Sequence, residues 1–507
     1  MIIDGNNLQI DDVVRVSRNG ESAALSPEAV DRINKSRAWV DGILESEKPV
    51  YGISTGFGDF SKIFISADKR ELLQRNLILS HATGVGDYLP EDVVRAAMLL
   101  RINSLSKGFS GIRLKTVEKL VEFLNRGICP AVPCKGSVGA SGDLAPLAHI
   151  ALVLLGEGEV IRDGKPRRSA EVLAEAGISP ITLASKEGLA LINGTQIMTA
   201  IAALVCHDAA NLMKISDIAA ALSLEALLGT LSAFDERIAL TRPHTGQVNT
   251  ARNVNRIAAD SEIIKSHKDC GKVQDAYSLR CVSQVHGASK DALRRAAETI
   301  VIEMNSVTDN PLIMPETGEI ISGGNFHGQP VALVMDYLKI AISEIGNISE
   351  RRINRMMDSH LSGLPAFLTA YPGLDSGLMI TQYTAAALAS ENKVLAHPAS
   401  VDSIPTSADQ EDHVSMGTIA ARQAAEILGN VREILAIELL AAAQGLDFLK
   451  PLAPGRGTAA AYKCLRRYVR HMDEDRIPAD DIKVVYNKIK DNEILNEVER
   501  VIGEIRV

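Results

Sequence analysis

Apolar residues recur at helical spacing along most of the chain. This spacing predicts long helices over roughly 189–234, 284–308, 328–357, 375–396 and 414–445, and a further helical stretch from about Lys69 to Arg126. Several of these segments carry few charges, as in Ile380–Ala396, where only Glu391 and Lys393 are ionised. A helix without a clear polar face is buried in a large bundle or in the core of an oligomer. The pattern therefore predicts a mostly α-helical protein.

The N-terminal part has a more mixed pattern. Short apolar runs predict strands at Asn6–Ile10 and Val13–Val16. Hairpins are predicted at Val160–Arg167, around Asp-Gly, and at Leu312–Ile321, around Thr-Gly. The glycine-rich segment Tyr51–Phe60 predicts a mobile loop.

Composition narrows the class of protein. Of 507 residues, 46% are hydrophobic but only 4% are aromatic, so aliphatic side chains and alanine must fill the core. A net charge of -9 without a basic block argues against a nucleic-acid partner. The first twelve residues hold acids and no apolar run, and charges interrupt the apolar stretch 197–234. We expect neither a signal peptide nor a membrane span, and hence a cytoplasmic protein.

The most unusual stretch is the run of small residues Gly139–Gly142 before Asp143. Histidines and cysteines are scattered along the sequence, so no metal site is expected. No dinucleotide-binding, phosphate-loop or nucleophile-elbow motif occurs between the elements that would make it convincing. Asp143 is suited to cap a following helix, which places the small residues at a positive helix end. Taken alone, the run fits a tight loop before a helix better than it fits a catalytic feature.

The catalytic interpretation rests on chemistry that Ala140-Ser141-Gly142 allows. Standard side chains are poor electrophiles. The Gly142 amide nitrogen is able to attack the Ala140 carbonyl, because glycine gives the backbone the necessary freedom. Loss of water closes a five-membered ring, and dehydration of Ser141 then leaves an exposed methylene. The product, methylideneimidazolone, is a strong electrophile made without any external cofactor.

Several separate segments together resemble the family of aromatic amino acid ammonia-lyases and aminomutases. The resemblance extends from about residue 2 to 500. Its motifs are the tripeptide segment, Tyr51–Gly58, Asn193–Gln196, Gln274–Arg280, Gly323–His327 and Asn392. It implies an aspartase/fumarase-like fold, with residues 1–200 carrying the Tyr51 loop and the electrophile and residues 201–507 forming a helical bundle. It also implies a homotetramer whose active sites are shared between subunits.

The resemblance assigns roles to individual residues. Tyr51 is expected to take the substrate's β-proton, and Arg280 to bind its carboxylate in a bidentate contact. Asn193 and Tyr277 are expected to contact the amine, the carboxylate or the ring carbonyls, with Asn193 the best donor to the electrophile's carbonyl. The electrophile itself is expected to be lined by Gln274 and Phe326.

Two positions bear on which aromatic amino acid is the substrate. Ser80-His81 lies at the family's selectivity position, where a polar pair suits an imidazole. Glu411 is able to accept a hydrogen bond from an imidazole N–H. Against a phenyl ring the same carboxylate would be buried and unpaired, at a cost of roughly several kcal/mol. Both positions predict L-histidine as the substrate and trans-urocanate and ammonia as the products, the first step of histidine degradation.

Some residues depart from the family's pattern, and rival functions remain. Asp409 replaces an expected asparagine, Ala276 an expected proline, and Gly328-Gln329 a more frequent Ala-Glu. These changes bear on substrate affinity and pH dependence.

The sequence leaves three alternative functions open. They are a 2,3-aminomutase with the same electrophile, a tyrosine or phenylalanine lyase, and an inactive helical scaffold.

Overall fold

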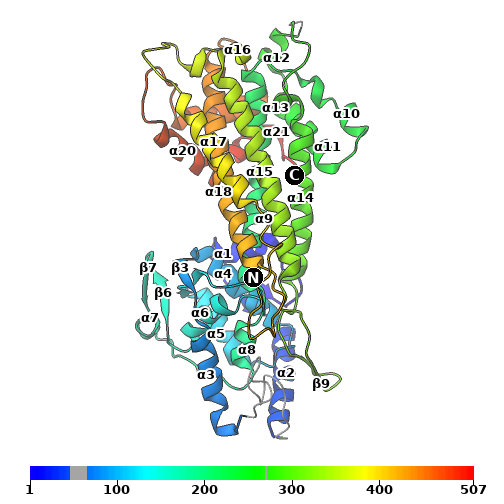
Figure 1. Cartoon of the computed structure of the whole chain (residues 1–507), viewed down its shortest axis with the longest axis vertical. Helices are drawn as coiled ribbons and strands as arrows, with labels where there is room; N and C mark the ends of the chain where they lie inside the picture. Colours follow the sequence, from blue (N-terminus) through cyan, green and yellow to red (C-terminus); the bar gives the residue numbers. More distant parts are fainter. Residues whose placement is uncertain (46–64, 269–270) are drawn as a thin grey trace. The chain divides into compact units, whose positions relative to one another are not determined.

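The structure is a computed structural model that describes residues 1–45, 65–268 and 271–507 (Figure 1). Its described part holds 21 α-helices and nine short strands, which confirms the mostly α-helical prediction. The chain forms two compact units, each built from three segments. Unit 1 comprises Met1–His207, Ala297–Asp336 and Pro398–Arg422, and unit 2 comprises Asp208–Ala296, Tyr337–His397 and Gln423–Val507. The domain ranges 1–200 and 201–507 stay a prediction.

Unit 1 combines helices with all the strands that the described residues form. Its helical elements are α1 (Ile10–Ser17), α2 (Pro27–Glu45), η2 (Ala67–Lys69), α3 (Arg70–His81), α4 (Glu91–Leu105), α5 (Leu114–Asn125), α6 (Leu144–Leu154), α7 (Ser169–Glu175) and α8 (Glu187–Ile192). Its strands are β1 (Ile2–Ile3), β2 (Ala24–Leu25), β3 (Val85–Tyr88), β4 (Cys129–Pro130), β5 (Pro133–Lys135), β6 (Glu159–Arg162), β7 (Lys165–Arg168), β8 (Leu312–Met314) and β9 (Glu319–Ile321). The pairs β1–β2 (parallel), β3–β5 and β8–β9 and the sheet β4–β6–β7 (all antiparallel) confirm both predicted hairpins.

The strands predicted at Asn6–Ile10 and Val13–Val16 were wrong. Helix α1 covers the second segment and the end of the first. The buried residues Val13 and Val16 are three apart, which fits one helical face. A reciprocal capping box between Gln9 and Asp12 also starts the helix: the Gln9 backbone N–H donates to Asp12 Oδ2 at 2.8 Å.

Three helices of unit 1 bring distant motifs together. Helices α3, α6 and α8 pack pairwise against one another. Helix α3 ends at His81, α6 begins directly after Asp143, and α8 ends just before Asn193. The fold of unit 1 therefore gathers the selectivity position, the tripeptide and the Asn193 motif.

Four long helices contribute residues to both units, and the remaining helices belong to unit 2. The four are α9 (Gln196–Ala226), α14 (Val282–Met304), α15 (Gln329–Met357) and α18 (Gly417–Asp447). The others are η3 (Leu231–Phe234), α10 (Glu236–Leu240), α11 (Thr245–Ile257), α12 (Glu262–Ser266), α13 (Tyr277–Arg280), α16 (Ser359–Ser362), η4 (Ala366–Leu368), α17 (Met379–Leu395), α19 (Arg456–Tyr468), α20 (Pro478–Lys490) and α21 (Glu493–Ile502). The helices predicted over 284–308, 328–357, 375–396 and 414–445 match α14, α15, α17 and α18 closely. The single helix predicted over 189–234 was wrong in part, because the chain leaves the helix between α8 and α9 and α9 ends at Ala226. Strand β3 likewise interrupts the helical stretch predicted over 69–126.

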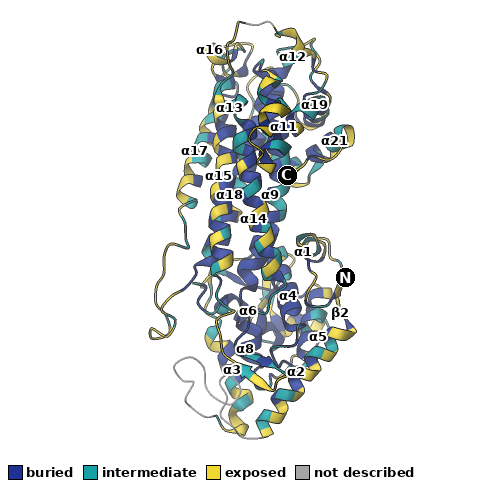
Figure 2. Cartoon of the chain, turned by 90° about the vertical axis from the view of Figure 1, so that its right-hand side faces the viewer, coloured by how far each residue is buried: buried dark blue, intermediate teal, exposed yellow. Residues whose placement is uncertain are grey.

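A buried polar network joins the long helices within unit 2. Helices α9, α15 and α18 run side by side there (Figure 1), and Figure 2 colours much of their length as buried. The fully buried Glu438 of α18 accepts hydrogen bonds at 2.6 Å from Ser223 of α9 and from Ser349 of α15. It also pairs with the buried guanidinium of Arg352. Each carboxylate oxygen is satisfied, as a buried charge requires.

Helix α9 is the one helix in the described ranges that is long and apolar enough to cross a membrane. However, 78% of its apolar stretch is buried inside the protein. This burial is typical of a core helix in a soluble protein.

Candidate active site

The tripeptide Ala140-Ser141-Gly142 lies in a tight backbone arrangement. The Gly194 N–H donates to the Ser141 carbonyl at 3.2 Å, and the Asp143 N–H donates to the Gly194 carbonyl at 2.7 Å. Gly142 has a φ of +74°, and a Cβ there would lie 2.1 Å from the Gly194 carbonyl oxygen. Only glycine fits this position. The close packing and the left-handed glycine suit the ring closure expected of the tripeptide.

The Asp143 side chain connects the tripeptide segment to other parts of unit 1. It precedes α6, but its side chain does not cap that helix, contrary to the expectation. Instead Oδ1 accepts from Ser137 Oγ at 3.0 Å and Thr418 Oγ1 at 2.5 Å, and Oδ2 accepts from the Met198 N–H at 2.9 Å. The carboxyl is fully buried, and burial raises its pKa although these donors oppose the rise. Asp143 thereby joins the tripeptide segment to the starts of α9 and α18.

Glu411 reaches the tripeptide from a segment far along the chain. Ser141 Oγ donates to Glu411 Oε1 at 3.0 Å, and Thr406 Oγ1 donates to Glu411 Oε2 at 2.8 Å. Glu411 was predicted as a substrate-binding residue, and the structure brings it to the Ser141 hydroxyl. No role was predicted for Thr406 from the sequence.

His81 is the half-buried last residue of α3. Its Nδ1 lies 3.1 Å from Ser80 Oγ. Burial lowers its pKa, and the charge of Glu411 acts in the opposite direction. Helix α3, which ends at His81, packs against α6, which begins directly after Asp143. The Glu411 carboxylate is hydrogen-bonded to Ser141, so both positions that predicted histidine belong to elements that contact the tripeptide segment or the helix after it.

Asn193 is held by a buried network. Its Nδ2 donates to Asp309 Oδ1 at 3.3 Å and to the Asn310 carbonyl at 3.2 Å. The other Asp309 oxygen accepts from the fully buried Lys186 Nζ at 2.7 Å. Asn193 Oδ1 is buried and has no hydrogen-bond partner among the described residues. The amide thus presents a free acceptor, and the donor at the Ser141 carbonyl is the neighbouring Gly194 backbone, which sequence reasoning did not single out.

Phe326 lies half-buried, two residues before Gly328. A Cβ on Gly328 would come within 2.9 Å of Ser415 Oγ, and Ser415 Oγ donates to the Gly139 carbonyl at 3.2 Å. The segment carrying Phe326 therefore approaches the segment carrying the tripeptide. Tyr51, the predicted base, lies outside the described residues.

Gln274, Tyr277 and Arg280 belong to unit 2. Tyr277 and Arg280 form the single turn α13, with the Arg280 guanidinium 4.6 Å from the centre of the Tyr277 ring. Gln274 lies in the irregular, exposed segment before it. Tyr277 is 71% exposed, and within the described residues the buried Arg280 Nε has no partner. This pair keeps donors and an aromatic face available for a ligand.

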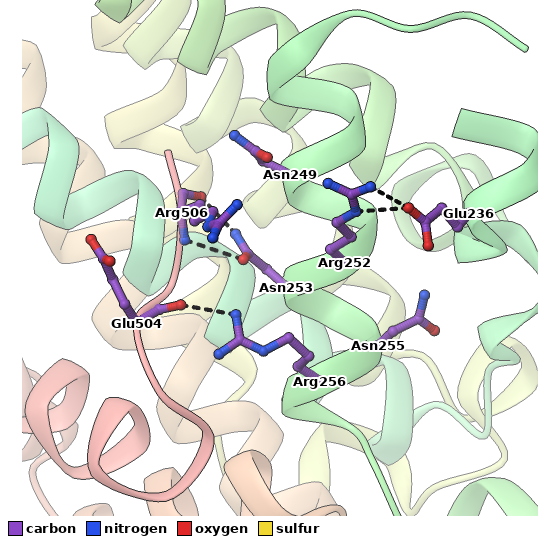
Figure 3. Close-up of a pocket in the computed structure, with 8 residues that line it drawn as sticks. All are labelled: Glu236, Asn249, Arg252, Asn253, Asn255, Arg256, Glu504 and Arg506. Atoms are coloured by element: carbon purple, nitrogen blue, oxygen red, sulfur yellow. Dashed lines mark hydrogen bonds and ion pairs between the residues drawn. The ribbon is translucent and has the colours of Figure 1, made fainter. Parts of the chain in front are cut away.

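Unit 2 also contains a polar cavity of about 580 Å³ beside α11 (Figure 3). Three arginines, three asparagines and two glutamates line it. Arg252 is paired with Glu236, and Arg256 donates to the carbonyl oxygens of Glu504 and Ile502. The cavity contains none of the predicted site residues, and contacts within the protein already occupy these two guanidinium groups.

Comparison with known proteins identifies the family of this chain. The model of the aromatic amino acid lyase family matches residues 8–467. A histidine ammonia-lyase from Alkaliphilus oremlandii is 57% identical over 99% of both chains. The crystal structure of histidine ammonia-lyase from Trypanosoma cruzi superposes with a TM-score of 0.93, at 43% identity over 99% of this chain and 96% of that one. Tyrosine aminomutase from Streptomyces globisporus has a TM-score of 0.95, at 41% identity over 100% of both chains. The chain belongs to the aromatic amino acid lyase family.

Proposed function

We infer that this protein is a cytoplasmic ammonia-lyase that converts L-histidine to trans-urocanate and ammonia, the first step of histidine degradation. The contact between Glu411 and the Ser141 hydroxyl carries this inference, because it sets an acceptor for an imidazole N–H beside the candidate electrophile. The identity to histidine ammonia-lyases over the full chain supports the same substrate.

The electrophile is a methylideneimidazolone made from Ala140-Ser141-Gly142, and it supplies a methylene that activates the substrate for loss of ammonia. The Gly142 amide nitrogen attacks the Ala140 carbonyl carbon, and the Ala140 oxygen leaves as water with the amide hydrogens of Gly142 and Ser141. The Ser141 hydroxyl leaves as a second water with the hydrogen on its own Cα, which forms the methylene. The Gly194 N–H then holds the Ser141 carbonyl and stabilises negative charge on it, in the manner of an oxyanion donor. Its 3.2 Å contact with that carbonyl supports this role.

The remaining residues bind and orient the substrate. Glu411 accepts from the imidazole N–H, and His81 lines the same pocket. Arg280 binds the carboxylate through its planar guanidinium. Asn193 Oδ1, the buried acceptor without a partner, receives the ammonium group. Tyr51 removes the β-proton, while Gln274, Tyr277 and Phe326 complete the site.

The active protein is a homotetramer, and each active site combines residues of several subunits. The exposure of Tyr277 on an isolated chain supports this arrangement, because a substrate-binding aromatic needs a second surface against it.

A substrate panel tests the activity. Purified protein should give a rising ultraviolet absorbance with L-histidine and none with L-tyrosine or L-phenylalanine, and Ser141→Ala should abolish the rise while the fold is kept. A rise with tyrosine alone would refute the proposed substrate. The match to tyrosine aminomutase makes a 2,3-aminomutase the second candidate. Detection of a β-amino acid by chromatography would favour it.

A further inference from the structure

The segment 406–411 folds back on itself in an unusual conformation. The Thr406 N–H donates to the Glu411 carbonyl at 2.9 Å, and the Glu411 N–H donates to the Thr406 carbonyl at 3.2 Å. Between them Ser407, Ala408 and Asp409 have φ values of 52°, 53° and 63°. The left-handed region is unfavourable for such residues, so contacts at the ends of the segment must hold it.

The two oxygens of the Glu411 carboxylate have different donors. Oε2 accepts from Thr406 Oγ1 at 2.8 Å, within the folded segment. Oε1 accepts from Ser141 Oγ at 3.0 Å, across 270 residues of sequence. One oxygen is therefore held by its own loop, and the other is directed at the tripeptide.

We propose that Thr406 is a positioning residue that holds the Glu411 carboxylate so that its Oε1 atom faces the imidazole of the substrate. This inference rests on the proposed function. Ring formation removes Ser141 Oγ as water, so Oε1 loses its donor. The Thr406 contact does not depend on that hydroxyl and persists. The fixed carboxylate then offers one free oxygen to an imidazole N–H without the cost of ordering its side chain on binding.

Paired variants separate positioning from structure. Thr406→Val removes the hydroxyl and keeps the branched shape, whereas Thr406→Ser keeps the hydroxyl. Thr241→Val is the matched control, because Thr241 is exposed and its hydroxyl donates only to the Ile238 carbonyl of the same turn. Steady-state kinetics with L-histidine give KM and kcat, and intact mass gives the loss of two water molecules that marks the closed ring.

We expect Thr406→Val to lower kcat/KM about tenfold or more, the usual range for losing a hydrogen bond to a charged group, mainly through a higher KM. Thr406→Ser and Thr241→Val should stay near wild type. All three proteins should show the mass of the closed ring.

Three results would overturn the proposal. One is wild-type KM and kcat/KM in Thr406→Val. Another is a Thr406→Ser variant no better than Thr406→Val. The third is a Thr406→Val protein that retains its two water molecules, which would assign the residue to ring formation instead. If the wild-type protein itself leaves histidine unchanged, the proposed function fails, and that result is distinct from these three.

Discussion

At the residue scale, Gly142 is subject to two separate constraints. Its φ of +74° disfavours any other residue, and a Cβ would lie 2.1 Å from the Gly194 carbonyl oxygen. Gly142→Ala should therefore destabilise the protein by about 2–4 kcal/mol, combining left-handed strain with overpacking. The added Cβ should also push the backbone of Gly142 away from Gly194, which should prevent ring closure and abolish most of the activity. Denaturant unfolding and intact mass measure the two effects.

Gly164 provides the matched control for this substitution. Its φ is +73°, but no atom lies within 4 Å of a Cβ built there. Gly164→Ala should cost only the strain, about 1–2 kcal/mol, and leave the activity unchanged. Equal effects of the two substitutions on stability would show that the contact with Gly194 is unimportant.

Glu303 introduces a pH dependence of stability. Thr195 Oγ1 donates to its carboxylate at 2.5 Å, but burial raises its pKa, and the charge of Asp143 adds to the rise. Between its unfolded and folded pKa values the folded state binds the extra proton, so stability falls as pH rises through this window. Above the folded pKa the cost of the buried charge is fully present. Urea unfolding from about pH 4 to pH 8 should show this fall, starting near the ordinary glutamate value.

Glu303→Gln removes the titrating group and should flatten that part of the profile. A profile identical to the wild type would contradict the role of Glu303. Thr195→Val is an informative partner variant. It removes the donor that opposes the shift, so the fall should extend to higher pH.

The sequence identified the candidate site residues better than it identified their contacts. Ser141 and Glu411 were both predicted, because a small-residue run and a motif mark them. Their hydrogen bond spans 270 residues, and local patterns carry no information on such pairing. The left-handed turn at 407–409 contains no glycine, the residue that most readily adopts positive φ, so its conformation was not predicted. Likewise, the backbone donor of Gly194 depends on geometry and not on residue type.

At the element scale, strong local signals predicted the structure well. The Asp163-Gly164 turn gave a hairpin because both residues adopt positive φ, as a tight turn between strands requires. The long helices followed from their spacing of apolar residues. Short elements were harder, since the valine-rich Val13–Val16 fits a short strand until the Gln9–Asp12 capping box is taken into account. Asp143 likewise precedes a helix, yet its side chain bonds the start of α9 instead.

Helices α9 and α14 share a buried cluster of ionisable side chains in unit 2. Asp217 accepts from Lys290 Nζ at 2.5 Å and lies 2.9 Å from His286 Nδ1, and all three side chains are fully buried. Lys290→Met leaves the carboxylate with an uncompensated charge, so unfolding free energy should fall by about 3–5 kcal/mol. Denaturant unfolding measures the loss. The exposed pair Arg237–Asp235 is the control, and Arg237→Gln should leave stability near wild type. A loss in Lys290→Met no larger than in this control would show that Asp217 is satisfied without the lysine.

At the scale of the whole molecule, many apolar side chains remain exposed on a single chain. Tyr383 and Val394 of α17 are 62% and 72% exposed, and Tyr277 of α13 is 71% exposed. Single exposed apolar residues are common, but these accompany helices with few charges. Together with the proposed tetramer, they predict that a monomer is not the stable form. Sedimentation should give four chains per particle, and a monomer at micromolar concentration would contradict the arrangement.

If active sites are shared between subunits, two inactive variants should complement each other in mixed tetramers. Ser141→Ala and Arg280→Met should each abolish most activity. If Ser141 and Arg280 of one site come from different subunits, co-expression in equal amounts leaves about a quarter of the sites with neither substitution. Activity should then return to roughly that fraction of wild type. Ser141→Ala co-expressed with Gly142→Ala is the control, since both changes damage the same segment and every site retains one of them. Recovery in neither mixture, with tetramers present in both, would mean that each chain builds its own site.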